Sequence, residues 1–416
     1  MRRVVVTGLG ALTPIGNDVP TYWKALQDGV SGAAAITQFE VSGQRTRFAC
    51  ELKGFRAEDF LSAKESKKLD RCAQYALAAS QQSITDAKLN ATSVCLDRVG
   101  VVWGTGIGGL KSLSDSIVAF AQGGPGAKMN PFFIPRMIVD MPAGHISIKH
   151  GFRGPNYATV SACASASNAI IDAAQLIWTG QADAVVCGGS EATITDVGLG
   201  GFSAIRALSE RNEDPASASR PFDQDRDGFV MGEGAGALVV EELSHAQARG
   251  AAIYAEVAGV GLSADAYHIT APHPQGAGAL LAMQRALQHA GMHPSELDCI
   301  NAHATSTPQG DVSEARAIAA LLGDASDRVQ ICANKSAIGH LLGASGAVES
   351  IAAILSLYDG VIPPTLNYER SDIDAVAKLN LTTGASRFER PQSVLKNTFG
   401  FGGHNTSIVY KRWVET

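Results

Sequence analysis

A cysteine, two histidines and a lysine carry the residue types that acyl-transfer chemistry needs. The cysteine lies in Val160-Ser161-Ala162-Cys163-Ala164-Ser165-Ala166, between a β-rich run at 157–160 and a helix predicted to begin near Ser165. A thiol at a helix N-terminus lies at the positive end of the helix dipole, which favours the thiolate. A single cysteine in an alanine-rich stretch is more often a small buried hydrophobe, so the residues that gather around Cys163 must decide its role.

Two further segments place imidazoles and an ammonium group at strand ends. His303 lies in Asn301-Ala302-His303-Ala304-Thr305-Ser306-Thr307-Pro308, after a strand-like run at 298–300. The segment Asn334-Lys335-Ser336-Ala337-Ile338-Gly339-His340 follows a strand-like run at 329–332. In α/β folds, ligands bind at the carboxyl ends of strands. These groups, with a glycine loop at 400–403, therefore indicate a catalytic site, although a plain hairpin turn also explains the loop.

Short β-branched runs alternate with alanine-rich stretches and must position these residues. We expect strands at 4–6, 99–103, 184–187, 237–240, 329–332 and 407–410, with a glycine turn at 7–10. This alternation is typical of α/β proteins with buried, partly parallel sheets. Residues 163–180 and 343–360 align at a constant offset of 180, pairing Ser165 with Ser345. The alignment favours a duplicated fold whose two helix N-termini meet at a pseudo-twofold axis, and chance similarity of two alanine-rich helices is the alternative.

The composition limits the class of protein. The chain has 416 residues, of which 45% are hydrophobic and 18% charged, with a net charge of −6. These values exclude a disordered protein, predict much buried surface and argue against nucleic acid as the main partner. No apolar run is long enough to span a membrane, and the seven cysteines are scattered without CxxC spacing. We therefore expect a cytoplasmic protein with free thiols.

Two motifs point to other functions. Residues 104–109 satisfy G-x-G-x-x-G after a predicted strand, but the acidic residue of a dinucleotide site, expected about 20 positions on, is missing. Residues 223–228 open like a calcium loop, but Glu233 stands one place before the position of the bidentate ligand. We expect no metal site here, and a NAD-dependent oxidoreductase is the weakest alternative function.

Taken together, these motifs resemble those of the β-ketoacyl-acyl-carrier-protein synthases, condensing enzymes of the thiolase superfamily, and most of all synthase II. The resemblance runs from Val4-Val5-Val6-Thr7-Gly8, through the motifs above and the segment 220–236, to residues 399–405. Ala304 departs from the family where many relatives carry glycine, and His404 where threonine or serine is common. The resemblance implies an α/β, five-layered αβαβα thiolase-like fold with two pseudo-twofold-related halves, 1–250 and 251–416, in a homodimer.

The same resemblance assigns roles to residues of the site. It implies that Cys163 takes the acyl chain as a thioester, and that His303 and His340 stabilise the enolate formed when malonyl-carrier protein loses CO2. Lys335 gives electrostatic support, paired with Glu349. Phe401 gates malonyl entry, and its N–H forms an oxyanion hole with that of Cys163. The predicted substrate contacts are Ile107, Ala162, Phe202, Arg206, Thr270, Thr305, Thr307, Leu342 and Phe399, with Phe133 reaching in from a partner subunit; Ile107 favours synthase II over synthase I.

A basic segment offers a docking surface for an acidic acyl carrier protein. Lys64, Lys67, Lys68 and Arg71 recur at i, i+3, i+4 and i+7, so on one helix they would form a single stripe, which Lys128 and Arg206 extend. A solvated helix face is the usual meaning of such a stripe.

The substrates implied by the resemblance arrive on phosphopantetheine, so we expect no cofactor, and a monovalent cation near Glu349 is left open. A ketosynthase of a polyketide or aryl-polyene pathway would use the same residues. A non-catalytic chain-length-factor-like subunit is a further alternative, which the presence of Cys163 and both histidines opposes.

Overall fold

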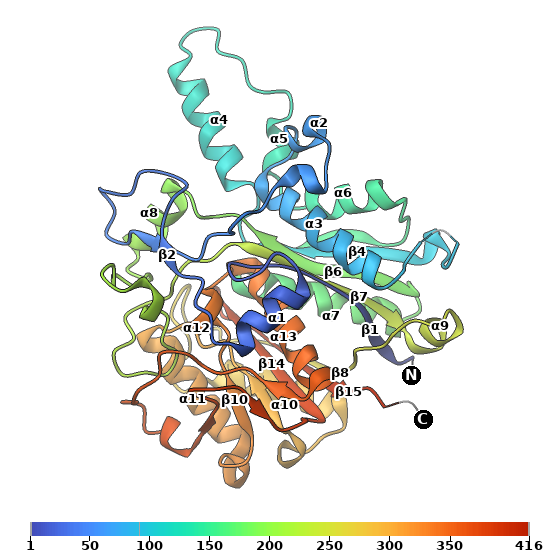
Figure 1. Cartoon of the computed structure of the whole chain (residues 1–416), viewed down its shortest axis with the longest axis vertical. Coiled ribbons are helices and arrows are strands. Elements are labelled where there is room, and N and C mark those ends of the chain that lie inside the picture. The colour runs from blue at the N-terminus through green and yellow to red at the C-terminus, as the bar shows by residue number, and fades with distance from the viewer. Residues whose placement is uncertain (1, 91, 415–416) are drawn as a thin grey trace.

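The computed structural model describes residues 2–90 and 92–414 and has a layered α/β architecture (Figure 1). Within these residues the main sheet has 11 strands in the order β12-β10-β9-β14-β15-β8-β1-β7-β6-β4-β5. Its strands are β1 (Val4–Leu12), β4 (Val99–Gly104), β5 (Asn156–Thr159), β6 (Ala184–Glu191), β7 (Gly234–Glu242), β8 (Ala255–Ala264), β9 (Cys299–Asn301), β10 (Gln330–Cys332), β12 (Asn380–Leu381), β14 (Ser393–Gly400) and β15 (His404–Arg412). Short two-stranded sheets pair β2 (Ala34–Ala35) with β3 (Phe48–Ala49) and β11 (Val361–Ile362) with β13 (Arg387–Phe388).

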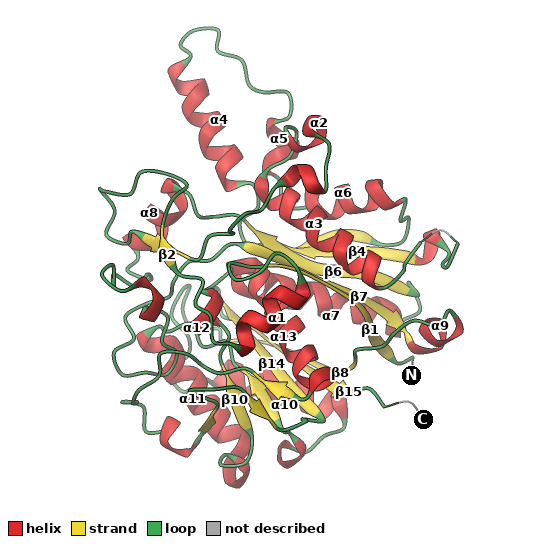
Figure 2. Cartoon of the chain, viewed as in Figure 1, coloured by secondary structure: helices red, strands yellow, loops and turns green. Residues whose placement is uncertain are grey.

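The helices lie outside and between the two halves of this sheet (Figure 2). They are α1 (Val19–Gln27), α2 (Ala63–Ser66), α3 (Arg71–Asp86), α4 (Leu110–Gln122), α5 (Phe133–Met137), α6 (Met141–His150), α7 (Ser165–Trp178), α8 (Asp196–Ala204), α9 (Leu243–Ala248), α10 (Ala277–Ala290), α11 (Pro308–Leu322), α12 (Lys335–Ile338) and α13 (Ser345–Asp359). Across the described ranges, we find no helix with both the length and the apolar character needed to cross a bilayer.

The two halves of the sheet have the same topology. When strands are numbered within each half, β1, β4, β5, β6 and β7 and their counterparts β8, β9, β10, β14 and β15 both follow the order 3-2-4-5-1. The first and fifth strands and the fourth and fifth are antiparallel in both halves, while the remaining pairs are parallel. The ladder continues between the halves, where Val5 of β1 pairs with Glu256 of β8. This correspondence confirms the predicted duplicated fold.

The central layer consists of α7 and α13, which begin with the two aligned segments. Helix α7 packs against β4, β6 and β7, whereas α13 packs against β7, β14 and β15. The helices meet at their first turns, where a Cβ atom added to Gly346 would lie 2.6 Å from the backbone nitrogen of Ser167. Helices α3 and α6 cover the outer face of the first half, and α10 and α11 lie on the outer side of the second. The five layers expected from the sequence are therefore present.

The predicted glycine turn at residues 7–10 is wrong, because β1 continues through it to Leu12. The strand is irregular between Val6 and Gly8, and both glycines of this segment face α3 at very short range. An added Cβ would lie 2.2 Å from the carbonyl oxygen of Ser83 at Gly8, and 2.1 Å from that of Ala79 at Gly10. These glycines allow a helix to pack closely on a strand and do not mark its end.

The predicted basic stripe does not lie on one helix. Helix α2 ends at Ser66, and α3 begins at Arg71 after Asp70, whose side chain accepts a hydrogen bond from the backbone N–H of Cys72. The first lysine of the stripe therefore lies on α2, the next two in the turn, and Arg71 at the start of α3. All four side chains are exposed, so they form a basic surface segment on a turn instead of a helical stripe.

Candidate active site

Cys163 lies in a short 3-10 turn, Ala162–Ala164, that connects β5 to α7. The residue before it, Ala162, has a φ of +51°, a left-handed conformation that turns the chain sharply into the helix. The thiol is 8% exposed and faces a cavity of about 500 Å³. The helix predicted to follow Cys163 begins at Ser165, as the sequence indicated.

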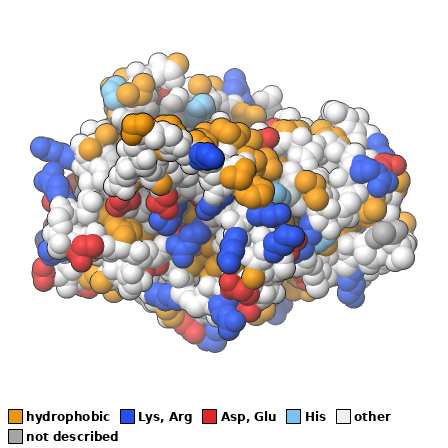
Figure 3. All heavy atoms as spheres, turned by 90° about the horizontal axis from the view of Figure 1, so that it is seen from above, with side chains coloured by type: hydrophobic (Ala, Val, Ile, Leu, Met, Phe, Trp, Pro, Cys, Tyr) orange, Lys and Arg blue, Asp and Glu red, His pale blue; other side chains and the backbone are white. Residues whose placement is uncertain are grey.

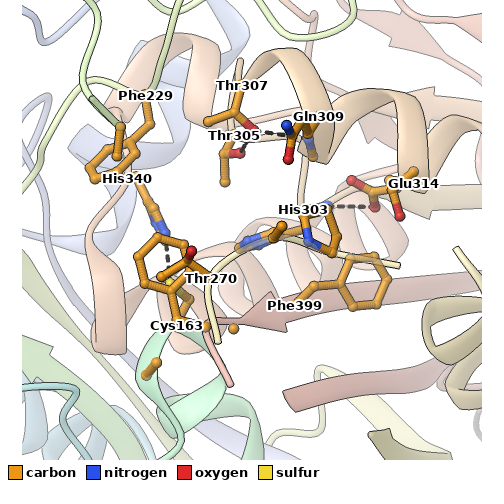
Figure 4. Close-up of a pocket in the computed structure, with 18 of the residues that line it drawn as sticks. Cys163, Phe229, Thr270, His303, Thr305, Thr307, Gln309, Glu314, His340 and Phe399 are labelled. Atoms are coloured by element: carbon orange, nitrogen blue, oxygen red, sulfur yellow. Dashed lines mark hydrogen bonds between the residues drawn. The ribbon is translucent and has the colours of Figure 1, made fainter. Parts of the chain in front are cut away.

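The nearest polar side chain to the thiol is an imidazole from the other half of the chain (Figure 4). Nε2 of His340 lies 3.0 Å from Sγ of Cys163, and Nδ1 of the same ring lies 2.9 Å from the hydroxyl of Ser345. The ring is 2% exposed, and burial together with the charges of Lys335 and Lys396 holds the pKa of His340 well below its usual value. His340 is therefore neutral near pH 7 and can accept the thiol proton.

The thiol itself is not acidified. Burial raises the pKa of Cys163 to about 11, although the charge of Lys335 and the backbone N–H groups of Phe401 and Cys163 act in the opposite direction. The helix N-terminus was expected to favour the thiolate, but desolvation of the thiolate outweighs the favourable groups. Cys163 therefore needs a base to become a nucleophile, and His340 lies at the distance that this role requires.

His303 is held by groups that fix which of its nitrogen atoms carries the proton. Nζ of Lys335 lies 3.2 Å from Nδ1 of His303, and an ammonium group can only donate in that contact. The proton of the neutral ring is therefore on Nε2. Glu314 of α11 accepts hydrogen bonds from the backbone N–H groups of His303 and Ala304 at 2.8 and 2.6 Å. Burial and nearby positive charge keep the pKa of His303 well below its usual value, so the ring is a neutral donor.

Behind the two imidazoles lies a buried cluster of charges. Lys335 pairs with one carboxylate oxygen of Glu349, as the sequence predicted. Lys396 of β14 lies 2.7 Å from the other oxygen of the same carboxylate. All three side chains are at most 1% exposed. The sequence analysis missed Lys396 and Glu314.

Comparison with known proteins assigns the chain to a family. A model of the beta-ketoacyl synthase N-terminal domain matches residues 1–246, and one of the C-terminal domain matches residues 254–369. The chain belongs to the β-ketoacyl synthase family. It is 49% identical over 412 residues to 3-oxoacyl-[acyl-carrier-protein] synthase 2 of Synechocystis sp., covering 99% of this chain and 98% of that protein. It is 46% identical to the protein of the same name from Vibrio cholerae, with 99% of each chain covered.

Solved structures give the same result. A beta-ketoacyl synthase from Burkholderia phymatum superimposes with a TM-score of 0.92 at 34% identity and full coverage of both chains. The ishigamide ketosynthase/chain length factor superimposes with a TM-score of 0.92 at 32% identity, covering 99% of this chain and all of that one. This β-ketoacyl synthase is therefore a condensing enzyme, an acyltransferase with a thiolase-like fold.

The cavity of this synthase brings together residues from distant parts of the sequence. All nine residues predicted to contact substrate contribute to its wall, together with Cys163, His303, His340 and Phe401. Lys335 lies behind the wall and contacts His303. The five predicted docking residues, Lys64, Lys67, Lys68, Arg71 and Lys128, do not line the cavity.

The glycine loop at 400–403 is both a hairpin turn and part of the synthase site. It joins the antiparallel strands β14 and β15, and a Cβ atom added to Gly400 would lie 3.1 Å from the backbone nitrogen of Cys163. Both readings of the loop are therefore correct. Ala304, the departure from the family noted above, has a φ of +30°, which explains why glycine is favoured at that position.

The G-x-G-x-x-G motif does not bind a dinucleotide, because a buried carboxylate takes the place of a phosphate. Glu191 accepts hydrogen bonds from the backbone N–H groups of Gly106, Ile107 and Gly343 at 2.7, 3.2 and 2.9 Å. Burial raises the pKa of Glu191 to about 7, although these hydrogen bonds lower it. The carboxylate thus joins the loop after β4 to the second half and orders the wall beside Ile107. The sequence analysis missed it.

The calcium-like loop is a structural turn, as expected. Asp223 accepts hydrogen bonds from the backbone N–H groups of Asp225, Glu369 and Arg370, so its oxygens are already satisfied. Arg226 of the same loop pairs with Asp372 at 2.6 Å. These contacts hold residues 369–372 of the C-terminal part of the chain against the loop.

Proposed function

We propose that this chain elongates an acyl chain by two carbons through decarboxylative Claisen condensation, taking the acyl group and the malonyl extender from acyl carrier protein. The observation that carries the proposal is the 3.0 Å contact between Sγ of Cys163 and Nε2 of His340, beside the Nε2–H of His303. The printed names of the relatives, 3-oxoacyl-[acyl-carrier-protein] synthase 2, support the choice of carrier and extender.

In the first half-reaction, the Cys163 thiol attacks the carbonyl carbon of the acyl thioester. His340 takes the thiol proton, and the negative oxygen is bound by the backbone N–H groups of Cys163 and Phe401, both of which lower the pKa of the Cys163 thiol. The intermediate collapses, the carbon–sulfur bond to the carrier breaks, and the leaving thiolate takes the proton from His340. The acyl chain is then a thioester on Cys163.

In the second half-reaction, malonyl thioester loses CO2. The electron pair of the broken carbon–carbon bond stays on the thioester, which becomes an enolate. The enolate oxygen accepts hydrogen bonds from Nε2–H of His303 and of His340, and its carbon attacks the acyl-Cys163 carbonyl. His340 must donate here, although it accepted a proton earlier. Its partner at Nδ1, the hydroxyl of Ser345, permits both tautomers because a hydroxyl group donates or accepts. Cys163 leaves as a thiolate and takes a proton from solvent water, the one proton that the condensation consumes.

The wall of the cavity supports an assignment of its parts. Ile107, Ala162, Phe202 and Leu342 offer apolar surface to the acyl chain. The hydroxyls of Thr305 and Thr307 lie 3.0 Å apart and can bind the pantetheine arm, with Thr270 and Arg206 nearer its entry. Phe399 packs its ring against that of His303, with centroids 5.8 Å apart, and Phe401 gates malonyl entry.

A metal is not part of this proposal. The ligand atoms of Cys163, His303 and His340 lie within 4.8 Å of one another, a donor set that zinc also uses. A histidine bound to zinc normally donates its other N–H to a carboxylate or carbonyl. Nδ1 of His303 instead faces the ammonium group of Lys335, which would repel a cation. We propose that the reaction needs no cofactor beyond the phosphopantetheine of its substrates.

The proposed partners are acyl carrier protein and a second copy of the chain. Lys64, Lys67, Lys68, Arg71 and Lys128 would bind the acidic carrier, and Figure 3 shows lysine and arginine side chains beside hydrophobic ones on the face viewed there. The edge strand β5 and its surroundings expose Tyr157, Val160 and Ile148, which fits a homodimer interface that would bring Phe133 to the partner's cavity.

The remaining proposals concern organisation and compartment. We place the division between the two halves at residues 250 and 251, in the connection from α9 to β8. All seven cysteines lie among the described residues and are free, which supports a cytoplasmic location.

Intact-protein mass spectrometry tests the function. Wild type is incubated with a medium-chain acyl-carrier protein and then with malonyl-carrier protein, beside Cys163→Ala. We expect one acyl adduct on wild type, none on the variant, and discharge of the adduct as 3-oxoacyl-carrier protein. An adduct that malonyl-carrier protein does not discharge would contradict the proposed extender, and absence of any adduct would contradict the catalytic role of Cys163.

A further inference from the structure

Lys396 is an unusual residue for its position, because it lies fully buried in a strand of the central sheet. It lies on β14 between Leu395 and Asn397, with none of its side-chain surface exposed. Burying an ammonium group is costly unless it is paired and hydrogen-bonded. Its Nζ meets Glu349 at 2.7 Å, the hydroxyl of Thr398 at 3.2 Å and the carbonyl oxygen of Asn397. These groups solvate the charge, and none of them belongs to the substrate cavity.

The oxygens around Nζ of Lys396 are those that a monovalent cation would use. A carboxylate, a hydroxyl and a backbone carbonyl are typical ligands of hard cations. The sequence left open whether such a cation lies near Glu349. One oxygen of this carboxylate faces Lys335 and the other faces Lys396, so a free cation would have to displace one of two tethered ammonium groups. The described residues therefore do not fit a bound cation beside Glu349.

The charge of Lys396 affects both imidazoles, directly and through Glu349 and Lys335. Glu349 is shared, so Lys396 limits how strongly the carboxylate can draw Lys335 away from Nδ1 of His303. The charges of Lys335 and Lys396 each lower the pKa of both His303 and His340, while the carboxyl group of the buried Glu314 also faces Lys396.

We propose that Lys396 is a positioning residue that acts as a covalently tethered cation, so that condensation in this enzyme needs no free potassium or sodium ion. Its ammonium group fills the cation position at Glu349, keeps Lys335 on His303 and thereby keeps the Nε2–H of His303 directed at the enolate. The inference rests on the proposed reaction only through this role of His303.

Chemical rescue tests the proposal. Wild type, Lys396→Ala and Lys396→Met are compared in release of CO2 from malonyl-carrier protein, with potassium, ammonium or methylammonium replacing choline at constant ionic strength. Lys396→Ala leaves space for a cation, whereas Lys396→Met fills that space without charge. Lys378→Ala, a change at an exposed lysine, is the matched control.

We expect the activity of wild type and of the control to be independent of the cation. Lys396→Ala should lose about 10- to 100-fold in choline, as expected when a supporting residue is removed, and recover at least part of this with a small cation, whereas Lys396→Met should not recover.

A pH profile separates positioning from a structural role. In Lys396→Met the pKa of His303 should rise. The pH below which the rate of decarboxylation falls should therefore be higher in this variant than in wild type. Thermal unfolding in each salt shows whether the variants fold. Potassium dependence of wild type, a folded Lys396→Ala with full activity in choline, or variants that fold in no salt would each overturn the inference. Lack of CO2 release by wild type would instead contradict the proposed function itself.

Discussion

Replacement of Gly400 by alanine should damage acyl transfer while leaving decarboxylation nearly intact. A Cβ atom at this position would lie 2.6 Å from the carbonyl oxygen of Ser161, and ordinary contacts begin at 3.4 Å, so the strand end must move by about 0.8 Å. That movement carries the N–H of Phe401 away from the thiol of Cys163, whose pKa this N–H lowers. Displacement of a reacting group by about 1 Å costs about 10²-fold, and loss of one oxyanion donor costs about 10²- to 10³-fold.

The two half-reactions can be measured separately. Acylation of Cys163 is followed by intact mass after rapid mixing with acyl-carrier protein, and decarboxylation by release of CO2 from malonyl-carrier protein. We expect acylation of Gly400→Ala to slow about 10²-fold, with decarboxylation changed by less than about fivefold, because His303 and His340 lie on other loops.

Gly144→Ala is the matched control for this prediction. Gly144 lies on α6, and outside its chain neighbours and the backbone of that helix no atom of the described residues lies within 4 Å of a Cβ built there. The same chemical change should therefore leave both rates unaltered. Our account of the oxyanion hole fails if a folded Gly400→Ala enzyme acylates Cys163 at the wild-type rate, or if both half-reactions slow equally.

The remaining predictions concern the imidazoles and the cavity wall. His303→Ala should reduce CO2 release from malonyl-carrier protein about 10²- to 10³-fold yet still form the acyl adduct by mass; equal loss of both would contradict its role as enolate donor. Because the pKa values of His303 and His340 lie well below their usual value, the condensation rate should show no inflection near pH 6.5 and should fall only at lower pH, as a pH–rate profile would reveal. Glu191→Gln should lower the free energy of unfolding by about 1–3 kcal/mol for each backbone N–H left unpaired, measured by denaturant titration, and an unchanged midpoint would refute this. Ile107→Trp should shorten the longest acyl chain that forms an adduct, and an unchanged chain-length series would show that Ile107 does not limit the pocket.

Cys163, His303 and Lys335 could be predicted from the sequence because each lies just beyond a strand, and His340 follows in the same segment as Lys335, after the short helix α12. In a layered α/β fold, such positions meet at one end of the sheet. The duplication also has a local signal, since the first turns of α7 and α13 are built from the same pattern of small residues. These inferences need only the order of strands and helices.

Buried charges could not be predicted in the same way. Glu314 lies on a helix and Glu191 at the end of a strand, where a carboxylate normally faces water. Their burial depends on loops that are distant in sequence. Lys396 did carry a signal, because it directly follows the apolar pair Val394 and Leu395 within one short strand. The raised pKa of Cys163 was missed for a related reason, since desolvation is a property of the closed fold and not of a helix terminus.

The sequence does contain a signal for the break between α2 and α3 in the basic segment. Ser62 and Glu65 form a capping box that begins α2, and Asp70 caps a second helix only eight residues later. Two caps so close together leave room for a single turn of helix between them. A periodic spacing of lysines indicates a shared helix face only where no second cap intervenes.

The duplication explains why the enzyme has one nucleophile and not two. At the offset of 180, Cys163 corresponds to Gly343, and the residues before them, Ala162 and Leu342, have matching φ values of +51° and +45°. A Cβ atom at Gly343 would lie 2.2 Å from the nitrogen of Gly106 and 2.6 Å from a carboxylate oxygen of Glu191, so no side chain fits there. The second copy of the turn instead donates its N–H to Glu191 and presents Leu342 to the cavity. One half thus supplies the thiol, the other supplies both imidazoles, and both halves line the cavity, so neither half alone contains a complete site.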